Sequence, residues 1–314
     1  MKAYYSTRYG GPEFAFYGDL PDAVAQKGEL LIEIKAVSIN PVDYKIMSGI
    51  ARIVSGNKFP KIFGTDFAGI VKEITEENEV YRPGDRVYGS SSVILGKQGA
   101  LAELFAVKPE KIRKIPDGMS FGEAASLPVA GLTALNGLRI CKTGQGTRVL
   151  VNGATGGVGH FAVQIARAKG AHVTATCSSA NSELARKLGA DAAMGYSNED
   201  LAAFDGSFDA IMDAYGKMSY SQICRLLKPG GTYVSTLFFP PAQFIAPLIR
   251  LFRARKLKSS NMRALPVDYE EIEKFWRDGK LIPLIDSVFP LSKCGDAFYH
   301  TEHGKPRGKV IVQV

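Results

Sequence analysis

Residues 148–169 restrict the fold of this 314-residue chain more than any other segment. The apolar run at 148–152 predicts a buried strand, and residues 157–169 predict a helix. The turn between them reads Gly153-Ala154-Thr155-Gly156-Gly157-Val158-Gly159. Glycines at such a junction allow a tight turn, close approach of the backbone to a pyrophosphate, and close packing of the helix on the sheet.

This strand–turn–helix context predicts a dinucleotide-binding site, because the helix N-terminus offers free N–H groups and a positive dipole end to an anion. The glycine spacing is G-x-x-G-x-x-G, and Ala154 stands where the usual pattern has its first glycine. A tight glycine turn without a ligand is the alternative, and the flanking strand and helix favour the dinucleotide site.

From residue 146 onward, strand-like and helix-like segments alternate. We expect strands at 148–152, 172–176, 192–196, 208–213 and 232–237, and helices at 157–169, 182–188 and 220–227. This alternation predicts an α/β fold, a doubly wound parallel sheet with helices on both faces.

The first third of the chain has a different pattern, with short strands at 29–40, 67–74, 86–88 and 101–107 and turn residues between them. Such a pattern predicts a small antiparallel barrel. The tail after about residue 265 is hard to add to a complete parallel sheet, so we expect it to return to the barrel. We therefore predict a barrel domain from 1–124 and 265–314, and a dinucleotide-binding domain from 125–264.

The end of the second predicted strand bears on the choice between NADPH and NADH. An NAD site usually has Asp or Glu there for the ribose hydroxyl. This chain has Cys177, Ser178, Ser179 and Asn181 instead, with no acid before Glu183. Hydroxyl and amide groups can donate to a 2′-phosphate without repelling it, so we predict NADPH as the cofactor.

Composition and charge exclude several classes of partner. The net charge of +8 comes from Lys and Arg spread along the chain, which argues against nucleic-acid binding and suits an anionic cofactor. The four cysteines form no C-x-x-C motif, and the N-terminus has no apolar signal core, so we expect a reducing, cytoplasmic location. The apolar segment 237–252 contains three prolines. It predicts a loop and amphipathic helix rather than stable membrane insertion.

Several motifs together are similar to the medium-chain dehydrogenase/reductase superfamily, in its quinone oxidoreductase and enone reductase branch. Besides the glycine turn, these are the runs at 40–45 (NPVDYK), 64–69 (GTDFAG), 127–134 (LPVAGLTA), 208–216 (FDAIMDAYG), 227–231 (LKPGG) and 307–310 (RGKV). The resemblance covers nearly the whole chain. It implies a GroES-like barrel domain, a Rossmann domain, and a cleft between them; members commonly form homodimers.

The resemblance also implies where site residues should lie. In zinc-bearing members a Cys, a His and a Cys bind catalytic zinc, and the matching positions here are Asn40, Thr65 and Ala130. None offers a thiolate or imidazole, so we expect no metal. The remaining cofactor contacts implied by the resemblance are Thr133 and the two loops that border the nicotinamide, with Ala214, Tyr215, Thr236, Leu237 and Phe238. Tyr196 matches the position that contacts the adenosine phosphate, although a buried tyrosine at a strand end is an alternative.

A metal-free mechanism restricts the substrate. Hydride transfer to a plain ketone concentrates negative charge on one oxygen, which zinc would normally stabilise. A quinone or an α,β-unsaturated carbonyl spreads that charge itself, so a few hydrogen-bond donors suffice. The candidate donors are Asn40 and Lys45, with Tyr44 as a possible proton source; a surface lysine is the alternative for Lys45.

These inferences predict an NADPH-dependent, zinc-independent oxidoreductase of small apolar quinones or enones. Two alternatives remain open: a reductase of saturated aldehydes, and a non-catalytic NADPH-binding regulator or interaction protein.

Overall fold

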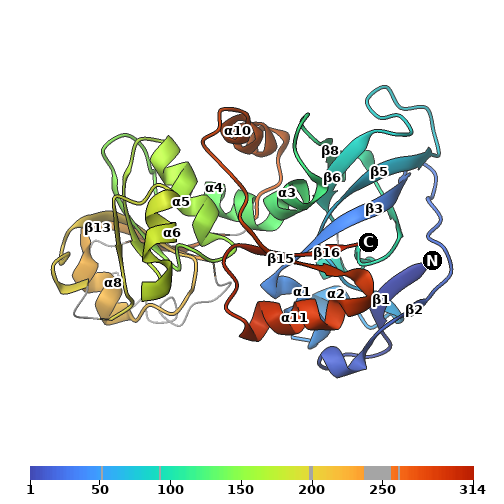
Figure 1. Ribbon diagram of the computed structural model, residues 1–314, viewed down its shortest axis with the longest axis horizontal. Coiled ribbons are helices and arrows are strands. Elements are labelled where there is room, and N and C mark those ends of the chain that lie inside the picture. The colour runs from blue at the N-terminus through green and yellow to red at the C-terminus, as the bar shows by residue number, and fades with distance from the viewer. Residues whose placement is uncertain (51, 92, 198–200, 237–255, 261) are drawn as a thin grey trace. The chain divides into compact units, whose positions relative to one another are not determined.

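The computed structural model describes residues 1–50, 52–91, 93–197, 201–236, 256–260 and 262–314. The chain forms two compact units. The first contains Met1–Val129 and Leu284–Val314, and the second contains Ala130–Pro283. Both termini therefore belong to the first unit (Figure 1).

The first unit is built on a largely antiparallel sheet with the strand order β15-β16-β3-β5-β6-β8, in which β7 also pairs with β3. A smaller sheet has the order β2-β1-β4. The strands are β1 (Lys2–Ser6), β2 (Ala15–Asp19), β3 (Leu30–Ile39), β4 (Lys61–Ile62), β5 (Asp66–Ile74), β6 (Arg86–Ser90), β7 (Leu104–Val107), β8 (Ile112–Lys114), β15 (Ile285–Pro290) and β16 (Lys309–Gln313).

Short helices connect these strands. They are η1 (Pro12–Phe14), α1 (Pro41–Met47), α2 (Arg52–Ser55), η2 (Val93–Leu95), η3 (Pro109–Lys111), α3 (Phe121–Ser126), η6 (Leu291–Lys293) and α11 (Cys294–His303), and a π-helical turn η4 (Leu127–Gly131) follows α3. The core includes Phe67, which is fully buried and makes an edge-to-face contact with Phe105 at 5.0 Å. Strand β16 pairs with β3, with Val310 opposite Ile39, so the C-terminal strand completes this sheet.

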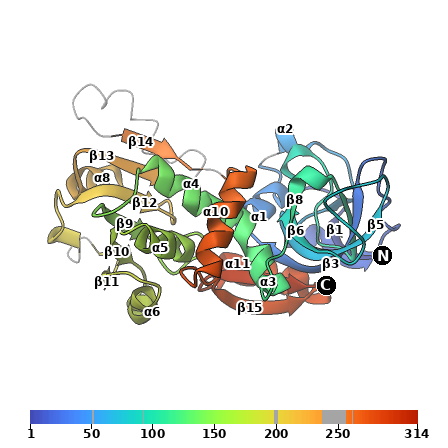
Figure 2. The same ribbon diagram turned by 90° about the horizontal axis from the view of Figure 1, so that it is seen from above.

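The second unit has a six-stranded parallel sheet in the order β11-β10-β9-β12-β13-β14 (Figure 2). Its strands are β9 (Arg148–Asn152), β10 (His172–Thr176), β11 (Ala192–Met194), β12 (Phe208–Asp213), β13 (Leu227–Ser235) and β14 (Lys256–Ser259). Its helices are α4 (Leu132–Ile140), α5 (Gly159–Ala168), η5 (Ser179–Asn181), α6 (Ser182–Lys187), α8 (Tyr220–Leu226) and α10 (Pro266–Arg277). This is the Rossmann strand order, and ligands of such sheets bind at the carboxyl ends of strands beside the point where the order reverses.

Helix α10 corrects the predicted return of the chain at residue 265. Arg139 of α4 donates to Asp268 at 2.7 Å and to Glu271 at 2.8 Å, which ties α10 to the second unit. Gln164 of α5 exchanges two hydrogen bonds with the backbone of Ile282, at 2.8 and 3.0 Å. These contacts keep residues up to Pro283 in the second unit, and the chain returns to the first unit at Leu284.

Candidate functional site

The glycine turn lies between β9 and α5 and has the close packing that its sequence predicts. Gly153 has a φ of +79°, a conformation that favours glycine. A Cβ on Gly159 would lie 2.0 Å from the Gly153 carbonyl oxygen, so only glycine permits this approach of helix to turn. The backbone N–H groups of Gly153 and Ala154 donate to the Thr176 carbonyl, at 3.0 and 2.9 Å, and attach the turn to β10.

Part of the turn is open for a ligand. The backbone N–H groups of Thr155, Gly157 and Val158 donate to no described residue, and Gly156, Gly157 and Val158 are partly exposed. Free N–H groups at the start of a helix form an anion site, because their dipoles point at the ligand. The geometry thus suits a phosphate group at this turn.

A buried polar network joins the strand ends next to the glycine turn, and it was not predicted from the sequence. Asn152 donates to Asp213 at 2.7 Å and accepts from Thr176 at 2.6 Å, so β9, β10 and β12 are joined where they end. Asp213 also accepts from the Tyr233 hydroxyl at 2.8 Å, and burial beside this carboxylate raises the Tyr233 pKa above its usual range. The network orients the strand ends on which a cofactor would lie.

Asp213 also orders the loop that follows β12. Its carboxylate accepts from the backbone N–H of Gly216 at 2.7 Å and from those of Tyr215 and Met218 at 3.2 and 3.3 Å. The Ala214 N–H donates to the Asn152 carbonyl at 2.9 Å. The loop predicted to border the nicotinamide is therefore fixed against the strand that carries the glycine turn.

The residues predicted to select the cofactor lie at the end of β10. Ser178 and Ser179 are exposed, whereas Cys177 is buried. The Asn181 amide donates to the Thr155 hydroxyl at 3.3 Å, which joins this segment to the glycine turn. Two exposed hydroxyls therefore lie close in sequence to an amide that contacts the turn.

An exposed aromatic pair with a lysine lies beside the turn. Tyr196 and Tyr215 are 45% and 50% exposed, and their ring centroids are 5.8 Å apart. Tyr196 is therefore not the buried tyrosine of the alternative interpretation. The Tyr215 Cβ lies 3.1 Å from the place of a Cβ on Gly153. The Lys217 ammonium lies 4.8 Å from the centre of the Tyr215 ring, and this cation was missed in the sequence because nothing in its spacing marks it.

Two further predicted cofactor residues are placed by backbone contacts. Thr133 is buried in α4, where its carbonyl accepts from Ser260 at 2.9 Å. Thr236 follows β13 and its N–H donates to the Asp213 carbonyl at 3.2 Å. The predicted residues Leu237 and Phe238 lie outside the described residues.

The three predicted catalytic residues lie at or in helix α1 of the first unit. Pro41 at the first helical position suits a helix start, and the Asn40 N–H donates to the Asp43 carboxylate at 2.8 Å. Tyr44 and Lys45 are half-buried. The Lys45 carbonyl accepts from the Ser48 hydroxyl at 3.0 Å, whereas its ammonium makes no hydrogen bond or ion pair with any described residue. Burial raises the Tyr44 pKa.

Asn40, in contrast, is almost fully buried, and its side-chain amide is hydrogen-bonded through both its nitrogen and its oxygen. Its amide N–H₂ group donates to the Ser38 carbonyl at 3.1 Å and to Asp66 Oδ2 at 3.0 Å. Its Oδ1 accepts from the Lys309 ammonium at 2.5 Å. Both amide hydrogens thus have partners within the protein, and none remains for an external oxygen.

Asn40 belongs to a buried cluster with two carboxylates and one ammonium. The Thr65 hydroxyl donates to Asp43, and the Val129 N–H donates to Asp66 at 2.9 Å. Burial raises the pKa of Asp43 to about 6 and that of Asp66 to about 7. Burial also lowers the pKa of Lys309 to about 8, against the opposing attraction of the two carboxylates. In each case the loss of hydration outweighs the favourable partners.

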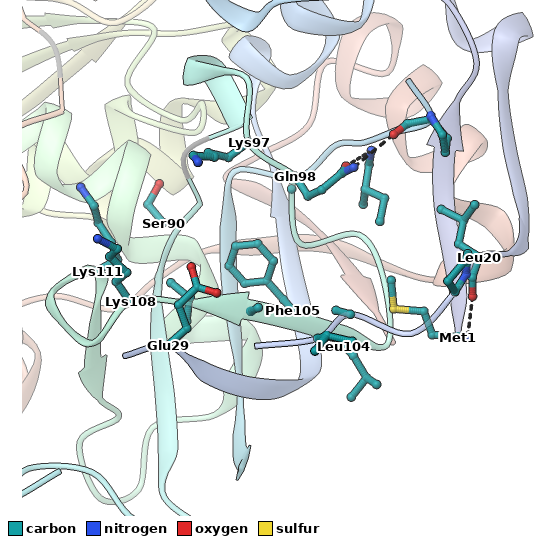
Figure 3. Close-up of a pocket in the computed structure, with 18 residues that line it drawn as sticks. Met1, Leu20, Glu29, Ser90, Lys97, Gln98, Leu104, Phe105, Lys108 and Lys111 are labelled. Carbon is teal, nitrogen blue, oxygen red and sulfur yellow. Dashed lines mark hydrogen bonds between the residues drawn. The ribbon is translucent and has the colours of Figure 1, made fainter. Parts of the chain in front are cut away.

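A cavity of about 480 Å³ lies elsewhere in the first unit. Phe105 and Leu104 of β7 line it, and Lys97, Lys108 and Lys111 lie around it (Figure 3). Asn40, Tyr44 and Lys45 are not among its lining residues, so this cavity is separate from the predicted catalytic residues.

Comparisons with known proteins decide the family. Residues 26–117 match the alcohol dehydrogenase GroES-like domain, and residues 188–312 match the zinc-binding dehydrogenase domain. A solved quinone oxidoreductase from Coxiella burnetii is 32% identical, with a TM-score of 0.91, and the match covers 100% of this chain and 99% of that one. The chain belongs to the medium-chain dehydrogenase/reductase superfamily.

Two curated relatives place it within the superfamily. A mitochondrial NAD(P)H oxidoreductase of Bos taurus is 32% identical over 100% of this chain and 89% of its own length. A 2-methylene-furan-3-one reductase of Solanum lycopersicum is also 32% identical, over 99% of this chain and 79% of its own length. The chain thus falls in the branch of quinone oxidoreductases and enone reductases, and its GroES-like and Rossmann domains confirm the predicted fold class.

The residues that the resemblance assigns to the zinc positions do not fit a zinc ion. The Asn40 oxygen already accepts from an ammonium, the Thr65 hydroxyl donates to Asp43, and the Ala130 side chain has no ligand atom. Asp66 Oδ1 is buried without a partner among the described residues, but one oxygen cannot form a tetrahedral shell. The described part of the chain contains no group of three or more His, Cys, Asp or Glu side chains that could hold a metal.

Among the described residues, no helix is both long and apolar enough to cross a bilayer.

Proposed function

We propose that this protein is an NADPH-dependent reductase that transfers hydride to quinones or α,β-unsaturated carbonyls without a metal ion. Two features of the structure together carry the proposal. The glycine turn has free N–H groups, and the side chains of Asn40 and Thr65 are already hydrogen-bonded to other residues of the protein. The first supplies a cofactor site, and the second leaves no ligand set for a Lewis acid.

NADPH rather than NADH is supported by the groups around the turn. Ser178 and Ser179 are exposed donors, and no acid lies at the end of β10 to repel a 2′-phosphate. Lys217 adds a cation beside the exposed pair Tyr196 and Tyr215. We infer that the two serines, Asn181 and Tyr196 contact the adenosine end of the cofactor, with Lys217 as an additional electrostatic contact.

The pyrophosphate is assigned to the segment 153–159. The free N–H groups of Thr155, Gly157 and Val158 would donate to its oxygens. We assign Thr133, Ala214, Tyr215 and Thr236 to the nicotinamide half, since they lie at or near the carboxyl ends of β12 and β13 or in α4. When bound, NADPH supplies the hydride, and the protein supplies alignment and electrostatics.

In the acceptor site, the structure favours Lys45 and Tyr44 over Asn40. Lys45 is half-buried and its ammonium has no partner among the described residues, so this ammonium can donate to an acceptor oxygen that becomes negative during hydride transfer. Tyr44 has a hydroxyl that can supply the proton. Both amide hydrogens of Asn40 are engaged, so we assign it a positioning role.

The acceptor class follows from this donor set. A single ammonium and a phenol stabilise a delocalised enolate or hydroquinone anion more readily than a localised alkoxide. The names of two relatives describe the same chemistry: one is a quinone oxidoreductase, and the other is a 2-methylene-furan-3-one reductase. Reduction of saturated aldehydes is the weaker alternative, because it would need a stronger electrophile than the side chains offer.

The test is NADPH oxidation by the purified protein with a panel of quinones, enones and saturated aldehydes, with and without a chelator. We expect turnover with quinones or enones, no loss of activity on chelation, and no stoichiometric zinc by elemental analysis. Loss of activity on chelation that added zinc restores would refute the metal-free mechanism. NADPH binding without turnover of any acceptor would favour a non-catalytic binding protein.

A further inference from the structure

The buried cluster joins three segments that are distant in sequence. Asp66, at the start of β5, accepts from the Asn40 amide at 3.0 Å and from the Val129 N–H at 2.9 Å. Thr65 donates to Asp43 in α1. The linked segments are thus residues 38–43, 65–66 and 129. Two of the family's metal positions, Asn40 and Thr65, are in these segments, and the third, Ala130, directly follows Val129.

Lys309 completes this cluster from the far end of the chain. Its ammonium donates to Asn40 Oδ1 at 2.5 Å and to the Ile39 carbonyl at 3.1 Å. The Asn40 amide therefore lies between opposite charges, with its oxygen toward Lys309 and its nitrogen toward Asp66. Lys309 is 3% exposed, and Asp43 and Asp66 are fully buried.

Charge explains why a cation is needed here. Two carboxylates without water are strongly unfavourable unless a positive group and hydrogen bonds compensate them. Both carboxylates attract the Lys309 ammonium electrostatically. A metal ion placed at Asn40 would meet this ammonium at hydrogen-bonding distance and would be repelled.

We propose that Lys309, acting through Asn40, is an internal cation that cross-links this cluster, at the place where the family resemblance puts a metal ion, and thereby positions helix α1. Lys309 touches neither substrate nor cofactor in this proposal, so it is a positioning residue. The link to catalysis rests on the proposed function, because it assumes that Tyr44 and Lys45 act on the acceptor. The cross-linking role itself does not depend on any activity.

The variant Lys309→Met tests the proposal, with Lys228→Met as the matched control. Lys228 pairs with Asp209 on the surface of the other unit. Without its cation the cluster should weaken, and we expect the Tm of Lys309→Met to fall by about 5 °C or more while that of Lys228→Met changes little. Hydrogen exchange should accelerate at least about tenfold at the Asn40 and Val129 N–H groups, which belong to the linked segments.

A divalent cation provides the sharper measurement. Lys309→Met frees the Asn40 oxygen, and this oxygen and the carboxylates of Asp43 and Asp66 are hard ligands of the kind that Mn²⁺ binds. Added MnCl₂ should therefore raise the Tm of Lys309→Met and slow its exchange, and it should affect neither wild type nor Lys228→Met. If Lys309→Met does not fold alone, refolding with and without MnCl₂ gives the same comparison. No response of Lys309→Met to MnCl₂ would show that the cluster does not serve as a cation site, and would overturn the proposal.

The double variant Lys309→Met/Asp66→Asn separates positioning from stability. It removes one charge of each sign, so we expect it to fold and to ignore MnCl₂. It still lacks the bond from Lys309 to Asn40, so exchange at Asn40 should remain fast. Acceptor kcat/KM should fall about 10- to 100-fold with NADPH affinity within about twofold of wild type. Wild-type exchange and wild-type kcat/KM in this variant would also overturn the proposal.

The two proposals fail in different ways. If wild type reduces neither quinones nor enones, the proposed function fails, but exchange and the response to MnCl₂ still test the internal cation. If wild type is active and Lys309→Met keeps wild-type exchange, only the internal cation is refuted.

Discussion

Two glycines of the same turn should respond to the same substitution in opposite ways. A Cβ on Gly159 would lie 2.0 Å from the Gly153 carbonyl oxygen and 2.9 Å from the Ala154 Cα. A Cβ on Gly156 would meet only the Gly153 oxygen, at 3.4 Å, which is an ordinary contact. Gly159→Ala should therefore disturb packing, whereas Gly156→Ala should leave the fold intact and add a methyl group where a phosphate is expected.

The magnitudes follow from these distances. An approach of 2.0 Å to a backbone atom cannot be relieved by a side-chain rotation, so helix α5 and the turn must separate. Overpacking of this kind costs roughly 1–3 kcal/mol, or a loss of about 3–10 °C in Tm for a unit of this size. Gly156→Ala should change the free energy of unfolding by less than about 1 kcal/mol. It should weaken NADPH binding at least about tenfold, which corresponds to about 1.4 kcal/mol.

The assay pairs thermal unfolding with NADPH titration for both variants. Gly144→Ala is the control, because a Cβ there meets no heavy atom within 4 Å and its φ is not positive. It should bind NADPH as wild type does and should be equally or slightly more stable. If Gly156→Ala loses stability while binding NADPH normally, or if Gly159→Ala unfolds as wild type does, the assignment of the two glycines is wrong.

Three further predictions concern single side chains. Ser178→Asp places a carboxylate at the end of β10, so NADPH should bind at least about tenfold more weakly while NADH is spared; wild type that prefers NADH in the same titrations would contradict the cofactor assignment. Lys45→Ala removes the proposed donor to the acceptor oxygen, so kcat should fall about 100- to 1000-fold with NADPH affinity unchanged. Values of kcat and KM near those of wild type would show that Lys45 is a surface lysine without a role in hydride transfer. Asp66→Asn removes a carboxyl whose pKa burial raises to about 7 from 3.8. Between these two pKa values the folded state keeps a proton that the unfolded state releases. The free energy of unfolding of wild type, relative to that of Asp66→Asn, should therefore rise as the pH falls from about 8 to 4, by at most about 1.4 kcal/mol per pH unit. A stability difference that does not depend on pH would show that Asp66 does not titrate in this range.

The parallel sheet was predictable because its signals are local. The strands at 148–152, 172–176 and 208–213 were predicted with the bounds that the structure has. The strands at 148–152 and 208–213 are short, mostly apolar runs beside turn residues, and burial on both faces produces such runs. The strand at 172–176 instead alternates polar and apolar residues. The glycine turn was predictable for the same reason, since its packing involves residues within one strand–turn–helix unit.

Contacts between distant segments could not be predicted in this way. Helix α10 was assigned to the wrong unit because its partner Arg139 lies 129 residues earlier. Lys309 lies 269 residues from Asn40, and no spacing rule connects them. Asn40 was therefore predicted as a donor to substrate, since its engagement by Lys309 and Asp66 appears only in the folded chain.

The connectivity of the first unit also sets an order of assembly during synthesis. The second unit is one continuous stretch, Ala130–Pro283, so it can fold as soon as that stretch leaves the ribosome. The first unit cannot, because β16 supplies the neighbour of β3 and Lys309 supplies the cation of the cluster. Until β16 emerges, β3 lacks one of its neighbours and the cluster lacks its cation. The proposed acceptor site therefore forms only after the second unit, to which we assign NADPH, has become free to fold.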